Sequence, residues 1–536
     1  MRSDQSKFTR TLSAKRFLDE ACSLQLVACS SLCSQLIARS YTTTRNPYHY
    51  TSMSTTLLFL VILFYFSLLI LISRLTSKHT RDSTFFDGNR ESPWFLVAFG
   101  MVGSGISAVS LVSIPGNVGN NNLYYVQFIL GTIVGYLFIA FVLLPIFYKL
   151  KLVSIYKYLD FRFGNVTYKT GSLFFLVSQS FGAALRLLLS VKILQYAFFD
   201  KLAIPHFLTI IVVLVLIWLY TNKSGIKTIV WTDALQSLFL ITVIIISIDT
   251  IRNSLNLSAP GMVKAIVQHR YSKLFDWDLQ SGSNFFKQFI SGLLITVALV
   301  GLDQSMMQKT LTVKDARSAR KNVLTFSFFI AFAQTLFLGM GVLMYLYAEQ
   351  KGIQLPSHNG KFVNTDDFYP LLTLHYFGKI GAIAFFIAVI ASTFASIDAC
   401  ITALTTAFSY DFMNFERQPH DQRTKIKNRV LLGVNVVMFF IVMSFWNSQG
   451  AIINTIFKIA GYTYGPILGL YLTGLFSKIS LKEKWVPIAC VAAALFTYLL
   501  NEYFIQAFHF DFGFMNILVN ALLTIIFLFI IKRKTE

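Results

Sequence analysis

Apolar stretches of about 20 residues recur from Ser54 almost to the C-terminus, and short polar segments separate them. Each stretch can cross the roughly 30 Å hydrocarbon core of a bilayer as an α-helix. The period-2 alternation of a transmembrane barrel is absent, and lipid offers free backbone groups no partner, so we expect helices. The pattern predicts an all-α integral membrane protein with about 13 transmembrane helices, near residues 54–75, 94–115, 124–148, 170–199, 207–220, 229–248, 284–303, 323–348, 376–410, 428–446, 451–476, 485–500 and 513–531.

Composition favours the same class of protein. Hydrophobic residues make up 55% of the 536 positions, charged residues 13%, and the mean hydropathy is +0.60. A soluble domain carries about 25% charge, so a lipid bilayer is the expected surrounding of this chain. The sequence has no GxxxxGK[ST] loop, GxSxG elbow, HExxH pair or CxxC pair. The motifs expected of an ATP-driven pump, a serine hydrolase and a zinc enzyme are therefore missing. We expect neither an enzyme nor an organic cofactor.

The net charge of +21 could indicate a nucleic-acid partner, but the charges are distributed as topology signals. Loops between the predicted spans alternate in Lys and Arg content, and the basic ones lie around residues 78–90, 149–169, 223–227, 309–321, 417–429, 478–484 and 532–534. The positive-inside rule places these loops and the C-terminus in the cytoplasm. We therefore expect a multi-pass protein of the plasma membrane, here the bacterial inner membrane, and no nucleic-acid partner.

Residues 1–52 do not fit this topology. They are rich in Ser and Thr and carry more basic than acidic residues, on what would be the outer side. Such a composition is typical of an organellar targeting segment. Alternatively, translation starts at Met53, directly before the first span. We favour the second explanation and leave residues 1–52 out of the predicted fold.

Small and hydroxyl-bearing residues crowd the second span, which reads GSGISAVSLVSIPG from Gly103 to Gly116. One interpretation is close helix packing through small residues. The other is a helix broken in mid-membrane, whose freed carbonyl oxygens bind a cation. The motif alone leaves both open.

Three further motifs follow in order along the chain. They are SGIKTIVWTDALQ over 224–236, DQSMMQKT over 303–310 and STFASIDACITALTT over 392–406. Together with the first motif, they resemble the sodium/solute symporter family, which includes carriers of proline, sugars, iodide and sialic acid. Each motif alone is weak, whereas four in order at the right spans are specific.

The resemblance runs from about Ser54 to Lys534 and implies a five-plus-five inverted-repeat, LeuT-like core. One helix would precede this core and two would follow it, in agreement with the spans counted above. The implied division is a leading helix and loop, a first repeat, an extracytoplasmic loop, a second repeat, and two trailing helices with a short cytoplasmic C-terminus, over 53–93, 94–248, 249–283, 284–476 and 477–536.

The resemblance also implies a sodium site shared by the first and eighth core helices. Sodium takes hard oxygen ligands. Carried over by motif, the site falls on the carbonyls of Gly103 and Ile106 and on Ser392, Ala395 and Ser396. Ser392 and Ser396 lie four residues apart, so both hydroxyls lie on one helix face. Ala395 departs from the Ser or Thr usual in the family, so one hydroxyl ligand is lost.

A second ion site is expected around Asp233. Some family members pair this Asp with hydroxyls of the eighth core helix, at positions that here are Asp398 and Ala399. Two close carboxylates in a membrane repel one another unless a cation lies between them. Asp233 and Asp398 are therefore predicted to bind a second Na⁺ or to share a proton. The alternative is a buried structural pairing with Arg186 or Lys192.

The solute site is expected inside the bundle. The resemblance places solute contacts at Ser110 and Gln127, and Thr296 and Gln334 occupy plausible positions on the sixth and seventh core helices. Arg186 lies deep in its predicted span. Its guanidinium would either bind a solute carboxylate through two hydrogen bonds or act as a structural counter-ion to the aspartates.

Two positions argue against galactose as the solute. The sugar-stacking aromatic residue and the sugar-binding Lys of the galactose carrier align with Leu299 and Ile330. Because Arg186 favours an anion, we expect a small anionic or zwitterionic organic solute.

These features predict a sodium-coupled symporter that imports a small organic solute by alternating access. Sodium ions, the solute and the bilayer are the expected partners. A proton-coupled or uncoupled carrier of the same fold is the alternative within this class. A transporter-derived membrane sensor is the alternative from another class, and it would add a large cytoplasmic signalling domain.

Overall fold

The computed structural model describes residues 92–533, apart from gaps at 153, 222–225, 354, 356, 359–360, 363, 414, 416–417, 449–451 and 509, and several positions between 60 and 71. The chain divides at residue 50, and all the described residues belong to the unit that follows. The predicted tail, residues 1–52, lies outside the described residues, and so does most of the predicted leading segment.

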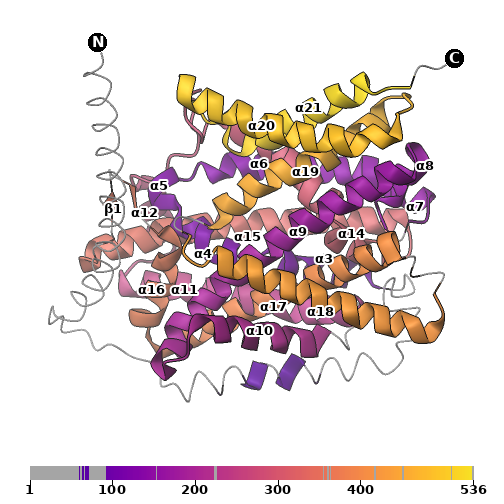
Figure 1. Ribbon diagram of the computed structural model, residues 1–536. Helices are drawn as coiled ribbons and strands as arrows, with labels where there is room; N and C mark the ends of the chain where they lie inside the picture. The colour runs from indigo at the N-terminus through magenta and orange to yellow at the C-terminus, as the bar shows by residue number, and fades with distance from the viewer. Residues whose placement is uncertain are drawn as a thin grey trace, which may run out of the picture. The chain divides into compact units, whose positions relative to one another are not determined.

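Long apolar helices dominate the described part of the chain (Figure 1). Those of the first half are α3 (Trp94–Gly105), α4 (Ala108–Gly116), α5 (Val118–Asn121), α6 (Tyr125–Phe138), α7 (Leu144–Lys149), α8 (Lys157–Arg162), α9 (Asn165–Leu194), α10 (His206–Thr221), α11 (Ile226–Ser254) and α12 (Ala259–Gln268). Short helical turns of other types are η4 (Ile139–Leu143), η5 (Gln195–Phe199) and η6 (Asp200–Leu202).

The second half of the described chain also consists mainly of helices. Its helices are α13 (Phe285–Thr296), α14 (Gln304–Thr310), α15 (Ala316–Lys351), α16 (Phe368–His375), α17 (Gly378–Met413), α18 (His420–Ser444), α19 (Ile452–Phe476), α20 (Val486–Phe508) and α21 (Asn516–Ile530). The short turns are η7 (Val297–Gly301), η8 (Thr365–Asp367), η10 (Glu483–Trp485) and η11 (Gly513–Met515). Strands β1 (Ser357–His358) and β2 (Lys361–Phe362) form a small antiparallel hairpin.

Two spans are broken in the middle. Helices α3 and α4 meet at an angle of 58°, and the α13–η7 segment meets α14 at 67°. At the first break, Ile106 and Ser107 have extended backbones, with ψ of 93° and 168°. At the second break, Asp303 is extended and its carboxylate accepts hydrogen bonds from the backbone N–H groups of Ser305 and Met306. The broken-helix interpretation of the first motif is confirmed, whereas the second break was not predicted.

The described residues do not confirm the predicted number of spans. Among the described residues, eight helices are long and apolar enough to cross a membrane, and counting each bent pair as one span gives up to ten. The apolar part of α10, His206–Leu219, is shorter than the others. The all-α membrane fold is confirmed, but the count of 13 is not.

Helix α17 lies at the centre of the helical bundle. In its most apolar 18-residue window 78% of the residues are buried, against 22% in that of α18. Four of the predicted ion-site residues, Ser392, Ala395, Ser396 and Asp398, therefore lie on the most buried of the candidate spans found among the described residues.

Glycines bring α6 and α13 into backbone contact. A Cβ atom at Gly131 would lie 1.9 Å from the carbonyl oxygen of Phe289, and one at Gly292 would lie 2.2 Å from that of Phe128. Only a residue without a side chain fits at such a crossing, as in other close helix pairs of membrane proteins. This crossing joins the two halves of the chain beside the second break.

Candidate functional site

Both helix breaks open onto one central cavity of about 140 Å³. Four of the five predicted solute-contact residues line it: Ser110, Arg186, Thr296 and Gln334. Its polar lining comes from α3–α4, α6, α9, α13, α14, α15 and α17. The cavity thus collects the polar side chains that the motifs supplied separately.

Gln127 is the predicted solute contact that does not line this cavity. Its side chain is fully buried. The amide Nε2 donates to the carbonyl oxygens of Tyr124 (3.1 Å) and Ser283 (2.8 Å), and Oε1 accepts from the N–H of Asp276 (3.0 Å). In this structure the residue ties the segment before α13 to the start of α6.

Arg186 projects its guanidinium into the cavity wall beside the second break. Its Nη1 donates to Sγ of Cys400 at 3.3 Å. Asp303 is a neighbouring carboxylate, but it caps α14 and also accepts from the hydroxyl of Tyr464 at 2.5 Å. Among the described residues, no carboxylate lies within ion-pair distance of Arg186. Since a guanidinium has five N–H donors, donors remain for a bound anion.

The predicted sodium-site residues come from the end of α3 and from α17. Ser392, Ala395 and Ser396 are at most 2% exposed on α17. The Ser396 hydroxyl donates to the carbonyl oxygens of Ser392 (2.9 Å) and Thr393 (3.2 Å), so its oxygen can still accept a cation.

Of these residues, Ser396 lines the cavity, together with Gly105 and Ser107 of the break. Helix α3 ends at Gly105, so its last carbonyl groups lack the partners that a continuous helix would provide. Gly103 packs closely against α11, where an added Cβ would lie 2.6 Å from the carbonyl oxygen of Asp233. Free carbonyls and a hydroxyl at one break are a donor set that suits Na⁺.

Asp233 forms an ion pair with Lys309. Nζ of Lys309 lies 2.5 Å from Oδ2 of Asp233, and both side chains are 1% exposed. The predicted alternative was a buried pairing with Arg186 or Lys192. Asp233 is in a buried ion pair, but its partner is Lys309. Lys309 was interpreted as part of a basic cytoplasmic loop, but it lies buried on α14.

Asp398, the other residue of the predicted second ion site, is 2% exposed on α17. The structure buries both carboxylates but gives a lysine partner to Asp233. The role of Asp398 stays a prediction.

Lys192 lies at one end of α9, away from Asp233. Its ammonium donates to the carbonyl oxygen of Ser448 at 3.2 Å. Nearby, Oδ2 of Asp366 accepts from the N–H of Ile452 at 2.8 Å, which ties η8 to the first turn of α19. Burial raises the pKa of Asp366 to about 6.

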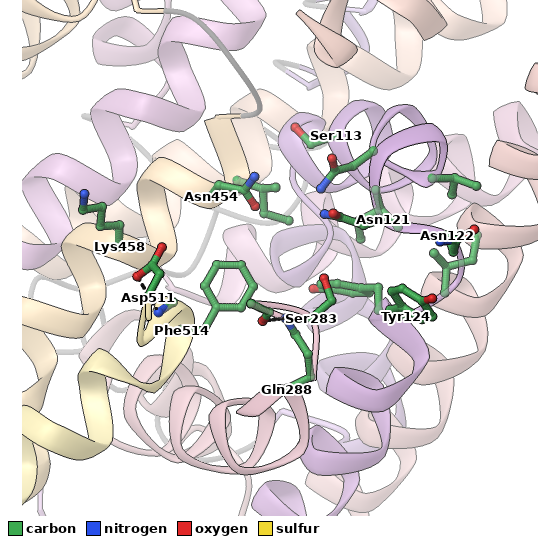
Figure 2. A pocket seen from close by; sticks show the side chains of 18 of the residues that line it. Ser113, Asn121, Asn122, Tyr124, Ser283, Gln288, Asn454, Lys458, Asp511 and Phe514 are labelled. Atoms are coloured by element: carbon green, nitrogen blue, oxygen red, sulfur yellow. Dashed lines mark hydrogen bonds between the residues drawn. The ribbon is translucent and has the colours of Figure 1, made fainter. Parts of the chain in front are cut away.

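A second and larger pocket of about 350 Å³ (Figure 2) shares Tyr125 and Ile453 with the lining of the cavity. Side-chain amides dominate its polar lining, and we call it the amide-lined pocket. They belong to Asn117, Asn121, Asn122, Gln288, Asn454 and Asn516.

Four aromatic rings lie between the two spaces. The ring of Phe128 stacks on Tyr125 (centroids 4.9 Å apart) and on Phe457 (5.4 Å), and Phe457 meets Phe514 edge-on at 5.0 Å. Tyr125 lines both spaces, Phe128 and Phe457 line the cavity, and Phe514 lines the amide-lined pocket. The aromatic cluster therefore contributes to the lining of both spaces.

The family follows from comparison with known proteins. The model of the sodium:solute symporter family matches residues 85–481. This chain belongs to the sodium:solute symporter family. The match covers both broken spans and all four motifs.

Curated relatives of this symporter-family chain are 21–25% identical to it over the aligned residues. The human sodium/iodide cotransporter is 21% identical over 403 residues, which are 73% of this chain and 61% of the relative. The mouse sodium-coupled monocarboxylate transporter 2 is 25% identical over 74% of this chain and 64% of the relative. The sodium/sialic acid symporter SiaT of Proteus mirabilis is 21% identical over 77% of this chain and 83% of the relative. The chain thus spans less than two thirds of the length of the first two.

A solved structure confirms the fold of this family member. It is a substrate-bound, outward-open Na⁺-coupled sialic acid symporter, with a TM-score of 0.73 at 18% identity, and the match covers 89% of this chain and 99% of that one. The LeuT-like architecture that the motifs implied is therefore the architecture observed.

Two features of the site were not found from the sequence. Asp303 looked like the start of a loop because polar residues follow it directly, yet it caps a half-helix inside the bundle. Lys309 was hidden in a run of basic residues. Asp is a preferred N-cap residue, and Asp303 was therefore the available signal for a helix that starts at the second break.

Proposed function

We propose that this protein is a sodium-coupled symporter that imports a small organic anion by alternating access. The observation that carries the proposal is Arg186, whose guanidinium faces a cavity shared by two broken helices and has no carboxylate partner at ion-pair distance among the described residues. A bidentate guanidinium–carboxylate contact is among the strongest polar contacts a protein makes. The relatives named for iodide, monocarboxylates and sialic acid support an anion.

The coupling ion would be Na⁺, bound at the first break. We propose the carbonyls of Gly103 and Ile106 and the oxygens of Ser392, Ala395 and Ser396 as its ligands. Ala395 can offer only its carbonyl, so we expect weaker sodium binding than at a site with a further hydroxyl. No organic cofactor enters the proposal.

A second ion at Asp233 and Asp398 is a further candidate. The buried Lys309 ammonium already neutralises Asp233, so a second Na⁺ would have to displace it. Proton coupling is the second candidate function, because a proton taken up by Asp233 from one side of the membrane would break this ion pair, and its release to the other side would form the pair again. Ion replacement separates these cases: proton coupling predicts uptake driven by a pH gradient without Na⁺.

The membrane orientation also belongs to the proposal. The basic segments near residues 157–169, 478–484 and 532–533 lie together: Arg162 donates to the carbonyl oxygen of Ser477 (2.7 Å), and the N–H of Arg533 donates to that of Ser480 (2.8 Å). One shared side supports a cytoplasmic location of these segments and of the C-terminus. The amide-lined pocket, built partly from the less basic set of connections, would then face outward. We propose the plasma membrane, or the inner membrane of a bacterium.

The two broken helices support the proposed inverted repeats, 94–248 and 284–476. Each repeat would begin with one of them, since α3 starts at Trp94 and α13 at Phe285. Sodium would hold the first break in its binding conformation and the anion would bridge to Arg186. The bundle would then rock to open the other side.

Uptake into proteoliposomes tests the proposal. Purified protein should accumulate one or more of lactate, iodide and N-acetylneuraminate only with an inward Na⁺ gradient. Arg186→Ala should abolish this uptake. Arg186→Lys keeps the charge but cannot donate two parallel hydrogen bonds to a carboxylate, so it should retain part of the uptake. Uptake that is unchanged in Arg186→Ala would contradict the anion site. Uptake that does not depend on Na⁺ would contradict the coupling.

A further inference from the structure

Helices α10 and α18, which lie side by side in Figure 1, leave a groove of about 480 Å³ between them. The two helices run in opposite directions, because His206 at the start of α10 stacks on Trp446 just after the end of α18, with ring centroids 4.6 Å apart. Apart from Asn435, every residue of the groove lining is aliphatic or aromatic. The Asn435 side chain is buried, and its amide donates to the carbonyl oxygen of Leu431 at 2.8 Å. The groove therefore offers a ligand hydrocarbon contacts.

The side chains of this lining can be reached from outside the bundle. On α18, Leu432 is 59% exposed and Phe440 is 64% exposed, and Ile211 and Val215 of α10 are exposed as well. From Leu432 to Phe440 the helix rises by about 12 Å, at 1.5 Å per residue. One leaflet of the hydrocarbon core is about 15 Å deep, half of the full thickness. The groove thus fits within one leaflet, where lipid acyl chains lie.

Two basic residues continue the groove face of α18 toward the start of the helix. Intervals of four, three and four residues place the following side chains on one face: Lys425, Arg429, Leu432 and Val436. Lys425 and Arg429 are exposed and take part in none of the ion pairs of the described residues. Arg429 is also the last charged residue before the apolar stretch of this span. Two cations at the end of an apolar groove match a lipid with an anionic headgroup.

The same charges argue against a second copy of this chain in the groove. In a closed dimer the same surface of both subunits meets around a twofold axis, and in a membrane equivalent residues then lie at equal depth. Packing α10 and α18 against their own copies would bring Lys425 and Arg429 of both chains together, and such like charges repel. An anionic lipid is attracted by these charges instead, and the cytoplasmic leaflet supplies such lipids.

We propose that the groove between α10 and α18 binds one anionic phospholipid. The phosphate contacts Lys425 and Arg429, and one acyl chain lies along Leu432 and Val436. In the proposed membrane orientation this lipid belongs to the cytoplasmic leaflet, because residues 417–429 form one of the basic connections. The lipid lies on the surface of the bundle, so its binding does not depend on the transported solute or on the coupling ion.

Native mass spectrometry of the purified full chain in detergent tests this site. The protein is titrated with an equimolar mixture of dioleoyl phosphatidylglycerol and dioleoyl phosphatidylcholine, which carry the same acyl chains and differ in net charge. The wild type should retain one phosphatidylglycerol per chain in preference to phosphatidylcholine. Lys425→Gln and Arg429→Gln should each weaken the apparent affinity for phosphatidylglycerol about fivefold, the contribution of one basic residue near a membrane surface.

A third variant tests the apolar part of the site. Val436→Trp fills the groove with an indole ring and should weaken phosphatidylglycerol binding although both cations remain. Matched controls lie at α20, where Lys484→Gln changes an exposed lysine just before the helix and Leu495→Trp enlarges an exposed apolar side chain. Both controls should bind the lipid as the wild type does. Since all five positions are exposed, each variant should keep the melting temperature of the lipid-free wild type.

The lipid site is overturned if the wild type retains both lipids equally, or if phosphatidylglycerol binding ignores the two glutamine variants on α18. It is also overturned if Val436→Trp binds like the wild type, or if Lys484→Gln weakens binding as much as Arg429→Gln does. A dimer in lipid-free detergent that Val436→Trp abolishes would assign the groove to a second copy instead. Sodium-driven uptake is measured separately in proteoliposomes, so none of these results contradicts the proposed function.

Discussion

Lys309 and Asp233 form a fully buried ion pair, with 2.5 Å between Nζ and Oδ2. The lysine lies on α14, the second half of one broken span, and the aspartate lies on α11, which packs against the first half of the other. The pair therefore joins the two breaks that shape the central cavity.

Removal of one partner should destabilise the protein strongly. Asp233→Asn or Lys309→Met leaves an uncompensated charge or a lone buried polar group, and breaking such a pair costs about 3–5 kcal/mol. The double variant Asp233→Asn/Lys309→Met should recover much of this loss, because neither charge remains. Thermal unfolding in detergent measures all three. Additive losses in the double variant would show that the two side chains do not act as a pair.

Gly292 should tolerate no larger residue. In Gly292→Ala the new Cβ would meet the backbone of α6, which cannot move aside as a flexible side chain can. Overpacking of this kind costs about 1–3 kcal/mol or more. Gly433→Ala on α18 is the control, because nothing lies within 4 Å of a Cβ there. A lower melting temperature is expected for the first variant alone, and equal melting temperatures would contradict the close crossing.

Gln127 and Gln334 should separate stability from transport. Gln127→Ala leaves the N–H of Asp276 without its acceptor and should lower the free energy of unfolding by about 1–3 kcal/mol. The KM of uptake should change little. Gln334 lines the cavity, and its Oε1 has no partner among the described residues. Gln334→Ala should therefore raise KM and leave the melting temperature nearly unchanged. The reverse pattern would restore Gln127 as a solute contact.

Asp366 should impose a pH dependence on stability. Burial raises the pKa of the Asp366 carboxyl group to about 6. Between the ordinary pKa of this group and pH 6, the carboxyl group is therefore protonated in the folded protein and ionised in the unfolded chain. Stability from this group is then present at low pH and is lost as the pH rises through that window. Asp366→Asn keeps an acceptor for the N–H of Ile452 and should remove this slope.

The measurement for Asp366 is the melting temperature of both proteins from pH 4 to pH 7. The exposed Asp278→Asn serves as the control and should follow the wild type. A parallel decline in the wild type and in Asp366→Asn would show that another group is responsible.

The sequence predicted the class of fold well, because mid-membrane helices carry an uninterrupted apolar signal. It also offered the first break as one of two interpretations of the small residues from Gly103 onward, and close helix packing was the other. The second break escaped because Asp303 and the polar residues after it look the same whether they form a loop or a half-helix inside a bundle. That distinction depends on tertiary contacts such as the hydroxyl of Tyr464, which lies far away in the sequence.

The candidate site was predicted in its parts but not in its pairings. Arg186, Thr296 and Ser110 were expected to meet, and they line one cavity. The partner of Asp233 could not be identified, because Lys309 lies in a basic run whose members are otherwise solvent-facing. Periodicity places a residue on a helix face, but it does not tell which distant helix lies opposite.

Sodium dependence of anion binding tests the central claim most directly. The measurement is the melting temperature of the purified protein with lactate, iodide or N-acetylneuraminate, each with Na⁺ and with K⁺ in its place, for the wild type and Ser396→Ala. A ligand that binds only the folded state raises this temperature. We predict stabilisation by at least one anion that requires Na⁺ and is weakened in Ser396→Ala. Equal stabilisation in Na⁺ and K⁺ for every anion would contradict sodium coupling at the first break.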